Sequence, residues 1–94
     1  MTVPEKQKPK PLIGNLSAVL RDALHSYDRG DLPRAEEILR QLIEAMPEVE
    51  TAWHLRGLTA QKRGDLNHAS EYLAEAQRLA PENPIFNRDL GAVL

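Results

Sequence analysis

The feature that most constrains this chain is an internal repeat of 34 residues. Shifting the sequence by 34 positions aligns Arg29-Gly30-Asp31-Leu32 with Arg63-Gly64-Asp65-Leu66, without a gap. Between residues 16–49 and 50–83, 11 of the 34 positions are identical. A repeat of this length is typical of arrays in which each unit buries its apolar side against its neighbours. The sequence therefore predicts two full repeats, 16–49 and 50–83, followed by a partial third repeat over 84–94.

Each unit has the pattern of a helix, a tight turn and a second helix. Apolar residues recur at three- and four-residue spacing on both sides of Gly30 and of Gly64, which indicates helices with one apolar face. Glycine readily adopts the positive φ with which many helices end. Asp31 and Asp65 follow directly, and we expect their carboxylates to cap the second helices. Because the sequence has no strand-like alternation, the expected fold class is all-α.

The two ends of the chain differ from the repeats. Asn83 and Pro84 are typical of a helix start, because asparagine caps helices and proline is tolerated in the first turn. Residues 1–14 are rich in lysine and carry three prolines within eight residues, a composition that disfavours a helix. We therefore expect a flexible Pro/Lys-rich leader over 1–14 and one helical repeat domain over 15–94.

With this period and these turns, residues 16–94 resemble the tetratricopeptide-repeat (TPR) family. The second repeat matches the family pattern at six positions, namely Trp53, Gly57, Ala69, Leu73, Ala76 and Pro81. The third matches it at Leu90 and Gly91, and the first is weaker because Leu42 replaces the usual small residue. The resemblance implies an α-solenoid of antiparallel helix pairs that winds into a right-handed superhelix.

One departure from the family pattern suggests a specific contact. The family usually has leucine just before the small residue of the first helix, but Asp22 and Arg56 occupy these positions here. Because the two positions are equivalent on neighbouring repeats, we expect these side chains to form an ion pair. The alternative is that both side chains point to solvent and that Leu55 packs in the core instead.

Composition excludes several classes of protein. Twelve lysines and arginines against 14 acidic residues give a formal net charge of −2, which argues against nucleic-acid binding. No stretch approaches the ~20 apolar residues of a membrane-spanning helix, so we expect no membrane partner. The chain has no cysteine, which excludes disulfides and thiolate metal sites and is compatible with the cytoplasmic location that we expect.

The sequence offers no catalytic constellation. None of the three histidines, His25, His54 and His68, has a histidine partner at the four-residue spacing of a helical zinc site. Four glutamates are expected on the outer face of the second helices, namely Glu36, Glu37, Glu71 and Glu75. We therefore expect no metal, no cofactor and no enzymatic activity in this segment.

The family resemblance implies a concave face, lined by the first helices, that holds an extended peptide or a partner helix. Carrying over the family's groove-lining positions gives eight candidate partner-binding residues, namely Leu20, Leu24, Tyr27, His54, Leu58, Gln61, Lys62 and Arg88. The set is apolar and basic, with Asp28 as an acidic exception. Alternatively, the three leucines pack between helices. Some family members bind the carboxyl-terminal tails of chaperones through a clamp of basic residues, and leucines occupy the corresponding positions here. This replacement argues against a free carboxyl terminus as the ligand.

The end of the chain leads to two functional hypotheses. The partial third repeat lacks a polar cap, so we expect a homodimer in which the 84–94 helix packs against a second copy. The first hypothesis is a protein–protein interaction module that binds a protein or peptide partner. The alternative is an N-terminal recruitment or dimerisation domain of a larger glycosyltransferase, sulfotransferase or hydroxylase whose catalytic part lies beyond Leu94.

Overall fold

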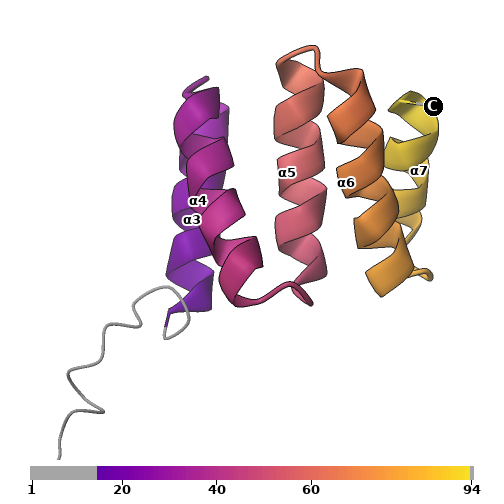
Figure 1. Ribbon diagram of the computed structural model, residues 1–94, viewed down its shortest axis with the longest axis horizontal. Helices are drawn as coiled ribbons and strands as arrows, with labels where there is room; N and C mark the ends of the chain where they lie inside the picture. Colours follow the sequence, from indigo (N-terminus) through magenta and orange to yellow (C-terminus); the bar gives the residue numbers. More distant parts are fainter. Residues whose placement is uncertain (1–14, 94) are drawn as a thin grey trace, which may run out of the picture.

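The computed structural model describes residues 15–93, which form five helices. They are α3 (Leu16–Asp28), α4 (Leu32–Ala45), α5 (Glu50–Lys62), α6 (Leu66–Leu79) and α7 (Pro84–Val93). No strand occurs within this range, so the predicted all-α class is confirmed. The helices stand side by side, and each contacts the next one along the chain (Figure 1). The predicted leader, 1–14, lies outside the described residues.

The two predicted repeats have matching backbone structures. The first helices α3, α5 and α7 begin at Leu16, Glu50 and Pro84, which are 34 residues apart. The second helices α4 and α6 begin at Leu32 and Leu66, with the same separation. In each full repeat a helix of 13 residues is followed by one of 14 residues. The identical positions of the sequence therefore correspond to identical positions of the helix pairs.

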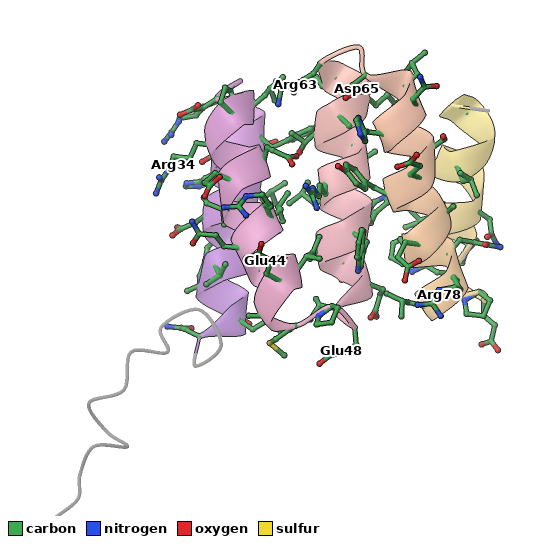
Figure 2. All side chains as sticks on the ribbon, viewed as in Figure 1. Arg34, Glu44, Glu48, Arg63, Asp65 and Arg78 are labelled. Carbon is green, nitrogen blue, oxygen red and sulfur yellow. The ribbon has the colours of Figure 1, made fainter. Side chains whose placement is uncertain are left out.

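The turns within the two repeats are also the same. Gly30 and Gly64 both have a φ of +84°, which only glycine adopts without strain. The amides of Asp31 and Asp65 donate to carbonyls five residues earlier, at 2.8 and 2.9 Å, and thereby close each first helix. Their carboxylates accept hydrogen bonds from backbone amides three residues later, at 3.4 and 3.2 Å. The predicted caps are thus present, and Arg63 and Asp65 lie at the α5–α6 turn in Figure 2.

The core lies where consecutive helices face each other, and small residues allow them to approach closely. One cluster joins α3, α4 and α5 through Ala23, Leu39, Leu42, Ile43, Ala52 and Leu55. Between α5 and α6, a Cβ placed on Gly57 would lie only 2.6 Å from Cγ of Leu73. Gly57 therefore leaves the space that the side chain of Leu73 occupies against α5.

The predicted ion pair between Asp22 and Arg56 is wrong. Asp22 is exposed, whereas Arg56 Nη2 lies 2.7 Å from Oε2 of Glu36 on α4. The guanidinium also lies 4.3 Å from the ring centroid of Tyr72 on α6. Because α5 packs mainly against α4 and α6 and only slightly against α3, the carboxylate within reach of Arg56 belongs to a second helix.

This ion pair also corrects the expectation for one of the glutamates. The side chains of Arg56 and Glu36 are only 14% and 24% exposed, so Glu36 does not belong to the solvated outer face. Glu37 on the same helix is exposed, as predicted, and pairs with Arg40 at 2.8 Å. Of the two adjacent glutamates, one therefore joins two helices and the other faces solvent. The negative charge of a glutamate alone does not predict whether Glu36 or Glu37 lies between the helices.

Candidate partner-binding groove

A groove with a volume of about 390 Å³ lies between α3 and α5, the first helices of the two full repeats. Its lining consists of residues from α3, namely Ser17, Leu20, Arg21 and Leu24, and residues from α5, namely Thr51, His54, Leu55 and Leu58. Each residue of the first set is 34 positions before its counterpart in the second. Equivalent surfaces of the two repeats therefore form the two sides of the groove.

Four of the predicted partner-binding residues line this groove together: Leu20, Leu24, His54 and Leu58. Leu24 is 46% exposed, so its side chain is available to a partner. Leu20 is half-buried and also packs against the core cluster of α3, α4 and α5. The alternative prediction, in which the leucines pack between helices, therefore describes Leu20 in part but not Leu24.

Tyr27 and Lys62 contact each other one helical turn beyond the leucines. Nζ of Lys62 lies 4.2 Å from the centroid of the Tyr27 ring, a cation–π contact between α5 and α3. Burial raises the pKa of the Tyr27 phenol, and the nearby carboxylates of Asp28 and Asp89 raise it further. The phenol therefore stays neutral at physiological pH, and the positive charge of Lys62 is not neutralised by it.

His54 connects the groove to α7. Its Nε2 lies 2.6 Å from Oδ2 of Asp89, and the two side chains are only 16% and 17% exposed. Its ring also packs against Phe86, with 4.7 Å between the ring centroids. Burial acts to raise the pKa of Asp89, but hydrogen bonds from His54 and Arg88 outweigh it, and the pKa is lower than usual. Asp89 is therefore a carboxylate that holds α7 against α5.

The other two predicted residues, like Tyr27 and Lys62, do not line this groove. Gln61 is half-buried on α5, and Arg88 is on α7, where its side chain is 74% exposed and its Nε lies 3.3 Å from Oδ1 of Asp89. Sequence reasoning missed four lining residues, namely Ser17, Arg21, Thr51 and Leu55, and it also missed Asp89 as the partner of His54. The 34-residue shift relates Ser17 to Thr51 and Arg21 to Leu55, but it does not by itself place any of them in the groove or pair Asp89 with His54.

Within the described residues, His, Cys, Asp and Glu side chains form no group of three that could hold a metal ion. His68 bonds Asp65 at 2.7 Å, which completes the cap of α6. None of the helices in the described part combines the length and the apolar character that a bilayer crossing requires.

Comparisons with known proteins leave the family open. A scan against models of protein families finds no match to this chain, and a search of curated proteins finds no significant match. The resemblance to tetratricopeptide repeats therefore stays a prediction.

Proposed function

We propose that this chain is a protein–protein interaction module, a short TPR-like α-solenoid that binds a segment of a partner protein in the groove between α3 and α5. The expected right-handed superhelix would present the first helices on its concave face. A module of this kind acts by binding, and its specificity depends on which side chains line the groove.

The groove itself is the observation that carries the proposal. Its volume of about 390 Å³ falls in the range typical of ligand sites, and leucines from both repeats line it. Leu24 is 46% exposed, although burying a leucine side chain is favourable by about 1.5–3 kcal/mol. A partner that covers Leu24 and Leu58 would recover part of this free energy.

The surface of the groove is almost entirely apolar, so burial favours an occupant with apolar side chains. Ser17 and Thr51, near the amino ends of α3 and α5, also line the groove, but they add almost no polar surface to it. Hydrophobic grooves are among the recurring sites at which proteins bind peptide segments.

A selection of displayed random peptides on the 94-residue chain tests this function. We expect the enriched peptides to bind the wild-type chain and to lose at least tenfold in affinity with Leu24→Asp. Leu66→Asp is the matched control, because Leu66 is 52% exposed at the first position of α6 and does not line the groove. Enriched peptides that lose equal affinity in both variants, or a selection that enriches none, would contradict the proposal.

A further inference from the structure

The groove between α3 and α5 lies close to the point where residues 1–14 join the helical repeats. Its lining begins at Ser17, the second residue of α3, and continues along this helix to Leu24. Residues 1–14 lie outside the described part of the chain, and Asn15 connects them to α3. A short covalent link of this kind gives a segment a local concentration in the millimolar range. These residues are therefore the first candidates for an occupant of the groove.

The predicted leader contains one adjacent pair of large apolar residues, Leu12 and Ile13. Because the surface of the groove is almost entirely apolar, this pair would lose unfavourable contact with water when it covers Leu24, which is 46% exposed. Two of the three residues before the pair are prolines, which restrict the backbone and reduce the entropy that binding costs. The apolar pair is therefore suited to the groove.

A chain that turns back at Gly14 and Asn15 would bring this pair to the leucines of α3. Glycine and asparagine are common turn residues, because both tolerate backbone angles that most other residues avoid. Three residues of extended chain, from Asn15 to Leu12, span ~9 Å. Along the axis of α3, Leu20 and Leu24 lie ~7.5 and ~13.5 Å from Asn15. Leu12 would therefore lie between the two leucines of α3.

The charges around the groove are mixed in sign, so they do not decide its occupant. Arg21 is exposed and lines the groove, and Lys62 lies beyond the leucines, so both cations oppose the approach of a lysine. Asp28 is exposed and lies seven residues after Arg21, on the same face of α3. Within residues 15–92 its carboxylate forms no ion pair, so it is available to Lys10, whereas Asp89 already accepts hydrogen bonds. The apolar contact therefore has to carry the binding.

We propose that the segment Pro11-Leu12-Ile13 of this chain binds in the groove, where Leu12 and Ile13 cover Leu20 and Leu24, and that a partner has to displace it. The leader exchanges between this bound state and a free state, and only the free state leaves the groove open. The inference concerns the same groove as the proposed function, but the binding of the leader does not require a partner.

Methyl NMR of the leucine-labelled full chain tests the contact without any ligand. Leu12→Asp/Ile13→Asp should shift the signals of Leu24 and Leu58, because it removes the segment that covers them. Thr2→Asp/Val3→Asp adds the same charge at the far end of the leader and should leave these signals in place. The signals of Leu39 and Leu73, which are fully buried between helices, should be the same in all three chains and report that the repeats stay folded.

Affinity for a peptide enriched in the display selection tests the competition. A leader that occupies the groove for half to four fifths of the time weakens a competing ligand by about two- to fivefold, because only the open fraction binds. We therefore expect Leu12→Asp/Ile13→Asp to bind the peptide about two- to fivefold more tightly than wild type. Thr2→Asp/Val3→Asp should bind it with the wild-type affinity.

The outcomes separate this inference from the proposed function. If the signals of Leu24 and Leu58 are the same in wild type and in both variants, the leader does not bind the groove and the inference is overturned, while enrichment of peptides would still support the function. Signals that change with protein concentration would identify a second copy as the occupant and also overturn it, as would an unchanged peptide affinity. If the signals shift as expected but no displayed peptide is enriched, the leader binds and the proposed function fails.

Discussion

Replacing Gly57 with alanine would place a methyl group inside the contact between α5 and α6. The new Cβ would lie 2.6 Å from Cγ and Cδ2 of Leu73 and 3.3 Å from its backbone nitrogen. Carbon atoms in good contact are about 3.5–4.0 Å apart, and Leu73 is fully buried and cannot swing into solvent. Overpacking of this kind costs about 1–3 kcal/mol, whereas alanine gains about 1 kcal/mol in helix propensity. We expect a net loss of about 1 kcal/mol.

Gly91 provides the matched control, because it occupies the equivalent position on α7 and no heavy atom lies within 4 Å of its Cβ position. Gly91→Ala should therefore show only the gain in helix propensity, up to about 1 kcal/mol. Urea and thermal unfolding followed by circular dichroism measure both effects, and 1 kcal/mol corresponds to a shift of about 4–8 °C in Tm. If Gly57→Ala stabilises the chain as much as Gly91→Ala, the proposed close contact with Leu73 is wrong.

Three further predictions concern ion pairs and assembly. A double-mutant cycle on Arg56→Met and Glu36→Met should give a coupling of about 1–2 kcal/mol in urea unfolding, whereas additive effects would contradict the ion pair. Because the pKa of Asp89 is lowered in the folded chain, its carboxylate stabilises the fold above the unfolded pKa of about 4, and this stabilisation is lost as the pH falls through the folded pKa. Below about pH 4, the free energy of unfolding should therefore decline more steeply in wild type than in Asp89→Asn. Sedimentation equilibrium at high concentration should detect a dimer that forms through α7. Ile85 is 47% exposed on this helix, so Ile85→Asp should weaken the dimer. A chain that stays strictly monomeric would refute self-association.

The helices and turns could be predicted from the sequence because local rules determine them. The 34-residue repeat gives the length of each unit, and Gly30 and Gly64 mark the turns, where positive φ is required. The following aspartates cap the second helices through short-range contacts. These features depend on residues close together in the chain, and the structure contains all of them.

The contacts between helices could be predicted only in part. Arg56 and Asp22 occupy equivalent positions, but equivalence does not say which neighbouring helix comes within reach of a side chain. The choice of Glu36 depends on how α4 packs against α5, and a long arginine side chain can reach several places. The groove was more predictable, because Leu24 and Leu58 are related by the repeat and face the same space.

A methyl NMR titration of the leucine-labelled chain with a peptide enriched in the display selection tests whether the groove between α3 and α5 is the binding site. We predict that the methyl signals of Leu20, Leu24 and Leu58 shift on binding. The signals of Leu39 and Leu73, which are fully buried between helices, should stay in place. Saturable binding that shifts only signals of α4, α6 or α7 and leaves those of Leu24 and Leu58 unchanged would show that the groove is not the binding site.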